Sequence, residues 1–154
     1  MVLSASSVKV WTETLNLIAE RAPHFIDITD DVERAVEAAG IANGFAVVFS
    51  RHTTAAIKIN EHEPELLKDM ESMLKRLAPP DAAYYHNNFY VRTVNMEEEE
   101  CPNGHSHCQH LLLSTSETVP VVAGRLALGR YQRIFFVELD RPRDRQVLIQ
   151  LMGS

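Results

Sequence analysis

Residues 133–151 read RIFFVELDRPRDRQVLIQL, and this stretch decides the class of fold that the chain adopts. Two segments in it, 133–139 and 145–151, are rich in branched or aromatic apolar residues, which favour β-strands. Between them, residues 141–144 combine a proline with charged side chains, a composition typical of a turn. We therefore predict two strands separated by a turn near the C-terminal end of the chain.

Strand signals also recur along the rest of the chain, as alternating or continuous apolar runs bounded by turn residues. The run 45–49 is continuously apolar and follows an Asn43–Gly44 turn signal, so we expect this strand to be buried. Gly124 marks a turn between two short paired strands. The further predicted strands are residues 7–17, 25–28, 51–60, 119–122 and 125–128.

Two longer segments carry helical periodicity. Thr29 has a side chain suited to an N-cap, apolar residues repeat at helical spacing over 30–39, and Gly40 provides a C-terminal stop. A second helix is predicted to begin at Pro64, because proline suits the first helical position. Its apolar stripe continues until the Pro79–Pro80 pair ends it.

The order of the elements indicates the fold class. A short third helix is predicted to begin near Ser106 and to reach residues 111–113. Strands outnumber helices and do not alternate with them regularly, which favours an α+β fold over a parallel α/β fold. We predict a single domain over residues 1–154, with a mainly antiparallel β-sheet or sandwich and two or three helices.

Composition and charge exclude several classes of protein. The chain is 45% apolar and 23% charged, and its net charge of −6 argues against non-specific binding to nucleic acid. No apolar run approaches the ~18 residues that a membrane-spanning helix needs. The N-terminal residues lack the layout of a signal peptide, so a cytoplasmic location is expected. In that compartment, Cys101 and Cys108 are not expected to form a lasting disulfide.

Seven histidines supply candidates for a metal site. His52 follows a predicted strand, His86 lies in a predicted loop and His107 begins a predicted helix, and side chains at such positions converge on clefts. Three neutral imidazoles with one water are typical of a catalytic zinc site. The alternative is that each histidine is solvated or hydrogen-bonded. Thr53 and Thr54 follow His52 directly and are candidates for substrate binding.

The segment 105–110, HSHCQH, has the histidine spacing of metallo-β-lactamase-like hydrolases, but Gln109 stands where those enzymes have an aspartate. A neutral amide oxygen is a poor metal ligand compared with a carboxylate, and no later histidine supplies the remaining ligands. We therefore do not favour this interpretation. The roles of His105, His110 and the two cysteines stay open. Residues 97–100, four glutamates, are interpreted as a solvated acidic loop.

Carboxylates and arginines elsewhere complete the set of candidate residues. Glu61 lies at the junction before the second helix, and Asp69 lies on the flank of that helix's apolar stripe. A partly buried carboxylate near a cation acts as a base or orients a histidine, whereas the alternative for Asp69 is an ordinary surface residue. The C-terminal third is locally rich in arginine. Arg130 and Arg143, each beside a turn, are candidates for binding a phosphate or carboxylate.

Six motifs follow one another along the chain and together resemble a known family. They are HTTAAIKINEHEP (52–64), Tyr84-x-His86, Asn103-x-x-x-His107, TVPVVAGRLALG (118–129), Tyr131-Gln132 and FVELDRPR (136–143). The set resembles the secondary thiamine-phosphate synthase enzymes. Any one motif is unspecific, but the combination is specific, and the resemblance covers residues 8–151.

This resemblance implies an α+β domain that assembles as a homotrimer, with a metal or small anion in a histidine-lined pocket near subunit contacts. It also implies a weak thiamine-phosphate synthase activity. Tyr131 replaces a common tryptophan of the family and Arg130 a frequent threonine, which affects the expected shape of the substrate pocket. By position, the family's histidines correspond to His52, His86 and His107, and its polar motif residues to Glu61, Asp69, Gln132 and Arg143.

The leading hypothesis is a metal-dependent enzyme that acts on a small phosphorylated metabolite. The implied reaction joins a thiazole phosphate to a pyrimidine diphosphate with loss of pyrophosphate. The alternatives are a metal-dependent hydrolase, a non-catalytic trimeric binder of a phosphorylated metabolite and a scaffold with a structural metal. The expected roles are metal binding, of zinc, for His52, His86 and His107, catalysis for Glu61, Asp69 and Gln132, and substrate binding for Thr53, Thr54, Arg130 and Arg143.

Overall fold

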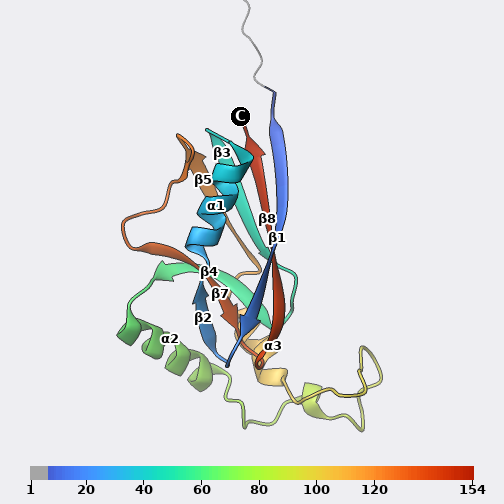
Figure 1. The fold of residues 1–154 in the computed structure, drawn as a ribbon. Coiled ribbons are helices and arrows are strands. Elements are labelled where there is room, and N and C mark those ends of the chain that lie inside the picture. The colour runs from blue at the N-terminus through green and yellow to red at the C-terminus, as the bar shows by residue number, and fades with distance from the viewer. Residues whose placement is uncertain (1–6) are drawn as a thin grey trace, which may run out of the picture.

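The computed structural model describes residues 7–154, and the first six residues of the predicted domain lie outside the described part. Residues 7–154 form the predicted α+β fold, with two antiparallel sheets and three α-helices (Figure 1). No helix in this part of the chain combines the length and the apolar character that crossing a membrane requires. The elements are β1 (Lys9–Ala19), β2 (His24–Asp27), α1 (Thr29–Ala39), β3 (Gly44–Ser50), β4 (Ala55–Glu61), α2 (Pro64–Leu77), the 3₁₀ turn η1 (Tyr85–Asn87), α3 (Gly104–Leu111), β5 (Ser116–Val122), β6 (Arg125–Leu126), β7 (Gln132–Glu138) and β8 (Arg143–Gly153).

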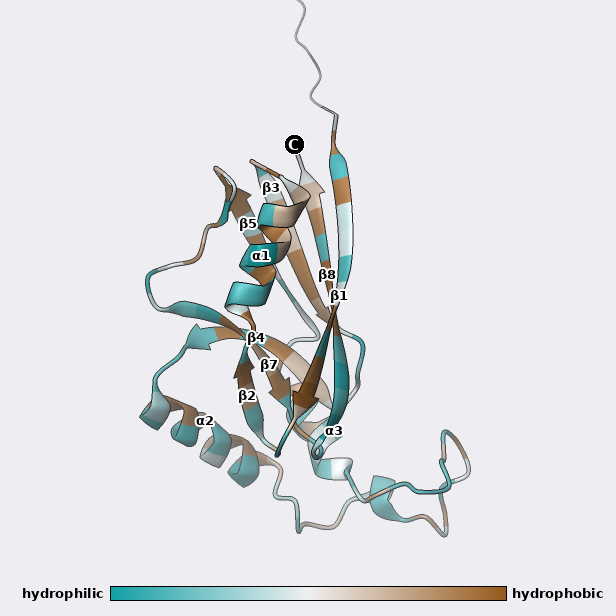
Figure 2. Ribbon diagram, in the orientation of Figure 1, coloured by the Kyte–Doolittle hydropathy of each residue, from teal (hydrophilic) through white to brown (hydrophobic). Residues whose placement is uncertain are grey.

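Strand β7 supplies side chains to two apolar cores. It is the middle strand of the three-stranded sheet, in the order β2-β7-β4, and is buried from Ile134 to Glu138. Successive side chains of a strand point to opposite faces. Ile134 and Phe136 enter a core shared with α1 and the larger sheet, whereas Phe135 and Val137 enter a second core beneath α2. Figure 2 shows the hydrophobic character of β2, β4 and β7 where these strands meet.

Strand β8 belongs to the other sheet, whose order is β1-β8-β3-β5-β6. Its side chains alternate between the core, as at Val147 and Ile149, and solvent, as at Gln146 and Gln150. The predicted turn at residues 141–144 therefore does not close a hairpin. It carries the chain from the three-stranded sheet to the five-stranded sheet, and β8 begins within it.

Strand β3 is buried on one face only, which corrects the prediction of a buried strand. Ala46 and Val48 are fully buried, whereas Phe45 and Phe49 are 41% and 39% exposed. Helix α1 lies across one face of the five-stranded sheet in Figure 1 and packs against its inward-facing residues. A continuous apolar run is typical of a strand buried on both faces, and here the outer face keeps apolar residues without that cover.

Helix α1 begins one residue earlier than predicted. Thr29 is its first residue and not its N-cap, a position that Ile28 occupies without a side-chain cap bond. The Thr29 hydroxyl instead donates to Asp27 Oδ1 at 2.7 Å and accepts from the Ile134 N–H at 2.8 Å, so it joins the helix to β7. Gly40, with a φ of 60°, ends the helix in the left-handed conformation that the sequence predicts.

Helix α2 begins at Pro64 as predicted, and the Glu63 carboxylate accepts hydrogen bonds from the first-turn N–H groups. The other end of α2 is held by Gln109 of α3. The amide nitrogen of Gln109 donates to the carbonyls of Leu74 and Ala78, at 3.3 and 3.1 Å. The Leu74 carbonyl also accepts the N–H of the C-cap residue Ala78 at 3.0 Å, so Gln109 adds a second bond at this end of the helix. Gln109 therefore has a structural role, and a carboxylate in its place would have no proton to donate.

Candidate functional site

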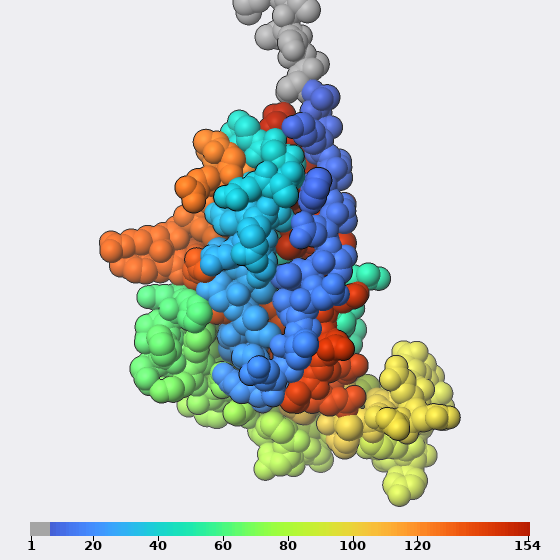
Figure 3. Space-filling view, in the orientation of Figure 1, coloured from blue at the N-terminus to red at the C-terminus, as the bar shows by residue number. Residues whose placement is uncertain are grey.

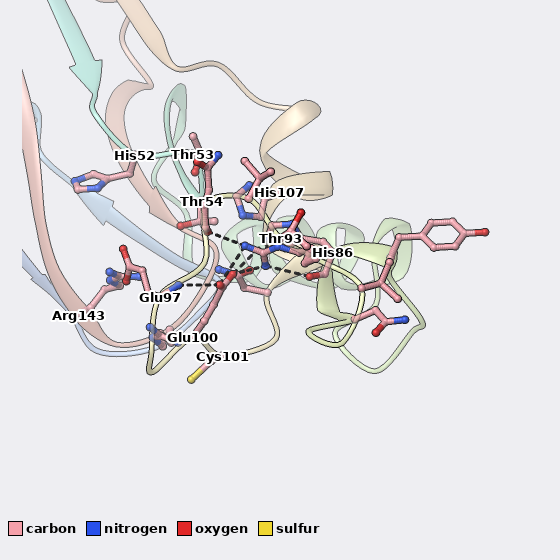
Figure 4. A pocket seen from close by; sticks show the side chains of 18 of the residues that line it. His52, Thr53, Thr54, His86, Thr93, Glu97, Glu100, Cys101, His107 and Arg143 are labelled. Atoms are coloured by element: carbon pink, nitrogen blue, oxygen red, sulfur yellow. Dashed lines mark hydrogen bonds and ion pairs between the residues drawn. The ribbon is translucent and has the colours of Figure 1, made fainter.

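A pocket of about 990 Å³ lies where loops and strand ends from distant parts of the chain meet (Figure 4). Its walls are residues 51–54 before β4, the crossing between β7 and β8, the start of α3, and a projecting arm that we define as residues 85–101. Figure 3 shows this arm, in yellow and yellow-green, standing out from the body of the molecule. The sequence predicted such a convergence of strand ends and loops.

His86 and His107 meet at the base of the arm. Their ring centroids are 4.6 Å apart and the rings lie at 65°, which is an edge-to-face contact. Gly104 allows this approach, because a Cβ atom there would lie 2.6 Å from Cβ of Tyr84. The Gly104 N–H also donates to Asn87 Oδ1 at 2.9 Å. The close packing of η1 on α3 is therefore what brings the two imidazoles together.

The surroundings of His107 favour its neutral form. Burial lowers the pKa of His107, the neighbouring His86 lowers it further, and Asp140 acts in the opposite direction. A neutral imidazole can accept a proton or bind a metal ion at physiological pH. His107 is therefore the residue of this pocket best suited to either task.

His52 lines the same pocket but does not join the other two histidines. Its Nε2 accepts a hydrogen bond from the Gln146 N–H at 3.0 Å, so its single proton resides on Nδ1 when the ring is neutral. Burial and the nearby Arg145 lower the pKa of His52, which favours that neutral form. Neither ring nitrogen then has a free lone pair for a metal ion. In Figure 4 the His52 ring lies apart from His86 and His107.

These contacts test whether a metal ion fits. Among residues 7–154, no three His, Cys, Asp or Glu side chains are arranged to hold one. His107 fits a ligand position, because its pKa is lowered. The adjacent His86 offers its Nδ1, since its Nε2 lies 3.4 Å from Nη1 of Arg92. His52 does not fit the third position in this conformation. A metal ion thus stays a prediction, and it rests on the His86–His107 pair.

A buried ion pair borders the pocket beside the predicted substrate-binding residues. Arg145 donates through Nε and Nη2 to the two carboxylate oxygens of Glu138, and both side chains are almost fully buried. The same Nη2 donates to Thr54 Oγ1 at 2.9 Å, which fixes the position of this hydroxyl. Thr53 and Arg143 also line the pocket. Three of the four residues predicted to bind substrate therefore lie at this site.

Arg92 holds the arm together, a role that the sequence did not predict. Its guanidinium group pairs with Glu100 and also donates to the carbonyls of His86 and Asn95, at 3.1 and 2.8 Å. The interpretation of Glu100 as a solvated residue is therefore wrong. The available signal was that Arg92 is the single lysine or arginine within residues 77–124 and precedes a run of glutamates.

Two residues that line the pocket each have a buried polar atom without a hydrogen-bond partner among the described residues: Nη1 of Arg141 and Oδ1 of Asn103. A buried polar atom left unpaired costs about 1–3 kcal/mol, so such an atom in a pocket indicates a ligand or an ordered water. An anionic oxygen is the strongest partner for a guanidinium group. The sequence placed Arg141 in a turn and gave no sign of this role.

The remaining predicted site residues lie elsewhere. Glu61 ends β4 opposite Gln132 of β7, about 20 Å along the strand from Ala55 at the pocket end. Asp69 is exposed on α2, and the guanidinium of Arg130 lies over the Tyr131 ring, 5.2 Å from its centroid. Within one chain the structure does not bring these residues to the pocket, and their roles stay predictions.

The other residues of the histidine-rich segment are divided between core and surface. His105 is buried, and burial lowers its pKa. Cys101 and Cys108 are both exposed free thiols, and Cys101 lies at the edge of the pocket. The dense cluster of histidines and cysteines in the sequence therefore does not form one site: Cys101 lies before α3, and within α3 His105 is buried whereas Cys108 is exposed.

Comparison with known proteins gives consistent matches over nearly the whole chain. The family described as UPF0047 protein YjbQ-like matches residues 13–154. A UPF0047 protein of Methanothermobacter thermautotrophicus is 44% identical over 147 residues, which cover 96% of this chain and 95% of that protein. The UPF0047 protein YugU of Bacillus subtilis is 34% identical over 142 residues, which cover 92% of this chain and 98% of that protein.

Solved structures of similar proteins have the same fold. A YbjQ-like protein of unknown function from Sulfolobus solfataricus is 34% identical with a TM-score of 0.86, and the match covers 96% of this chain and all of that one (100%). A hypothetical protein from Aeropyrum pernix is 36% identical with a TM-score of 0.83, covering 94% of this chain and 99% of that one. These names describe no activity, so a proposal about chemistry has to rest on the pocket.

Proposed function

We propose, from the premise that this chain belongs to the UPF0047 family of YjbQ-like proteins, that it is an enzyme acting on a small phosphorylated metabolite in the pocket beside the arm. The observation that carries the proposal is the buried Nη1 of Arg141, which has no partner among the described residues and lies in the same pocket as the His86–His107 pair. Arg141 would bind the phosphate oxygens, and the neutral imidazole of His107 would contact the group that reacts.

The charge of the pocket supports an anionic substrate. Five arginines line it but only two glutamates, although the whole chain has a net charge of −6. Arg145 and Arg92 are neutralised by Glu138 and Glu100, so they shape the site more than they attract a ligand. Arg141 is the cation best placed to bind phosphate oxygens. Arg143 at the rim pairs with Asp140 through Nη1, so only its other nitrogens are available to a ligand.

The finer part of the proposal is thiamine-phosphate synthase activity. In this reaction a thiazole nitrogen attacks the CH₂ carbon of a pyrimidine diphosphate, the carbon–oxygen bond breaks, and pyrophosphate leaves. Arg141 and Arg143 would stabilise the charge that develops on the leaving group. The volume of about 990 Å³ is at the upper end of the ~300–1,000 Å³ range of ligand pockets, so it has room for two small substrates.

A divalent ion, zinc, is a further part of the proposal, and His86 and His107 are the residues that would hold it. Such an ion would supply additional positive charge for phosphate oxygens. Metal analysis of protein purified without a histidine tag tests this part, since His107→Ala is expected to lower the bound metal. The homotrimer and the cytoplasmic location are separate proposals, and light scattering measures the first directly.

The activity itself is tested with two variants and a control. Pyrophosphate release from the two substrates is expected to fall about 10²–10³-fold in His107→Ala, the usual effect of removing a group that stabilises developing charge, here either directly or through a bound ion. Arg141→Gln is expected to weaken pyrophosphate binding, measured by calorimetry. Arg34→Gln, on the exposed side of α1, removes one positive charge far from the pocket and is the control for net charge.

The rival function is a non-catalytic binder, which would use the same arginines without the imidazole pair. It is supported if Arg141→Gln abolishes pyrophosphate binding while no preparation, with or without added zinc, turns over the substrates. If His107→Ala and Arg141→Gln both retain full turnover and full affinity, the pocket is not the site, and the proposal fails in either form.

A further inference from the structure

The orientation of the Asn103 side chain is fixed by its neighbour. Its amide nitrogen Nδ2 donates to Oδ2 of Asp140 at 3.4 Å, and the same oxygen accepts a bond from Arg143 at 3.2 Å. Because a carboxylate accepts hydrogen bonds and cannot donate them, the nitrogen of the amide has to face Asp140. The amide oxygen Oδ1 consequently faces the other way, is buried, and has no partner among residues 7–154.

The residue that follows Asp140 carries a donor without a partner among the described residues. Arg141 directly follows Asp140 in the chain, and its Nη1 is buried and unpartnered among the described residues. Both Arg141 and Asn103 line the pocket. The pocket wall formed by Asn103, Asp140 and Arg141, which we call the corner, thus contains one strong donor and one acceptor, each of which loses free energy if it is left unpaired.

Nη1 of Arg141 and Oδ1 of Asn103 need opposite hydrogen-bonding groups on a ligand. The guanidinium nitrogen requires an acceptor, which any oxyanion provides, whereas the amide oxygen requires a donor. Inorganic phosphate carries both, because it keeps at least one O–H group at neutral pH. Sulfate has the same shape and size but no O–H, so it would leave Oδ1 of Asn103 unpaired.

We propose that the corner formed by Asn103, Asp140 and Arg141 selects a phosphoryl group that retains an O–H donor, such as free phosphate or protonated pyrophosphate, and rejects sulfate. This inference rests on the proposed function and specifies its substrate class, since a protonated phosphate or pyrophosphate is what a phosphoryl leaving group becomes. Asp140 is a positioning residue in this scheme, because its bond to Nδ2 sets the orientation of the Asn103 acceptor.

The test is calorimetric titration of the full-length protein with inorganic phosphate and with sulfate, at equal ionic strength. At about pH 8 both ions are mainly dianions, so they differ chiefly in the O–H group. Phosphate is expected to bind wild-type protein roughly tenfold to a hundredfold more tightly than sulfate, the usual effect of leaving a buried acceptor unpaired. Asn103→Ala is expected to bring the ratio of the two affinities close to one.

A matched control comes from the same pocket. Asn88 also lines it, but its Oδ1 already accepts a bond from the Tyr90 N–H at 3.3 Å. Asn88→Ala is therefore expected to keep the phosphate-to-sulfate ratio of the wild type. Arg141→Gln is expected to weaken both ions alike, because both present oxyanions to the guanidinium. Thermal unfolding of each variant establishes that it is folded, and Asn103 makes no cap bond to α3 that the substitution would remove.

The outcomes separate this inference from the proposed function. Equal binding of phosphate and sulfate by the wild type, with both weakened in Arg141→Gln, overturns the selection for an O–H group and leaves the anion site standing. If the wild type binds neither phosphate nor sulfate, both the selection for an O–H group and the proposed function are wrong. If Asn103→Ala is folded and keeps the wild-type ratio, the acceptor is another group and the inference is wrong. If Asn103→Ala does not fold, the phosphate-to-sulfate affinity ratio of the wild type decides whether the selection for an O–H group exists.

Discussion

At the scale of single residues, His52 depends on one backbone hydrogen bond. The Gln146 N–H of β8 donates to Nε2 at 3.0 Å, which turns the ring away from the His86–His107 pair. The sequence placed His52 correctly at a strand end beside the pocket. It could not reveal which ring nitrogen is occupied, because that depends on a strand more than ninety residues later in the chain.

We expect NMR spectroscopy to find His52 protonated on Nδ1 and not on Nε2 at neutral pH. Burial and Arg145 lower its pKa, so its protonation midpoint should fall below the ordinary value of about 6.5. As the pH falls through that midpoint, Nε2 gains a proton and the bond from Gln146 is lost. Long-range proton–nitrogen correlation spectra follow both changes. A proton on Nε2 at neutral pH would contradict the observed bond from Gln146. A lower zinc content in His52→Ala than in the wild type would show that His52 does bind the metal ion.

At the scale of elements, the junction between β7 and β8 explains how the pocket is kept in shape. Glu138 ends β7, Arg145 lies near the start of β8, and these strands belong to different sheets. Their ion pair is buried and also holds the Thr54 hydroxyl before β4. One pair of charges thus fixes three segments of the pocket wall.

Breaking this pair is expected to destabilise the fold strongly. Glu138→Gln leaves the Arg145 charge buried with a neutral partner, a change that typically costs about 3–5 kcal/mol. The free energy of unfolding, measured with urea, reports the loss. The matched control is Glu65→Gln, since Glu65 pairs with Lys68 at the exposed surface of α2, where little change is expected. If the free energy of unfolding falls by the same small amount in both variants, the Glu138–Arg145 pair does not stabilise the fold.

The elements themselves followed from the sequence wherever local chemistry determines them. Pro64 and Gly40 mark helix boundaries through their own backbone preferences, so both predictions are confirmed. Thr29 was assigned to the wrong position because its hydroxyl bonds to β7, a contact that local sequence does not encode. The run 45–49 was expected to be buried, and the exposed Phe45 and Phe49 show that apolar content does not specify how many faces are covered.

At the scale of the whole molecule, the candidate site could be predicted only in part. The sequence predicted that His52, His86 and His107 converge, and all three line one pocket, but only His86 and His107 are in contact. It grouped Glu61 and Gln132 with them, although the β4–β7 ladder separates the two ends of the sheet. It placed Arg141 in a turn and assigned it no role, since an unpaired buried atom becomes visible only when all of its surroundings are known.

The two cores are expected to unfold together. Side chains of β7 enter both, Ile134 and Phe136 on one face and Phe135 and Val137 on the other, so neither core survives without this strand. At a fixed protein concentration, Trp11 fluorescence, which reports on β1, and far-UV circular dichroism should therefore give coincident urea transitions. Two separate midpoints would show that the cores are independent.

The crossing at residues 141–144 limits how this chain can be divided or recombined. It looks like an ordinary surface turn, but the strand that follows it lies between β1 and β3, which come from the first third of the chain. A cut there would separate β8 from the rest of the chain, so the five-stranded sheet would lose an inner strand and its covalent link to β7 of the three-stranded sheet. Insertions, splits and circular permutations of this protein should therefore be made elsewhere in the chain.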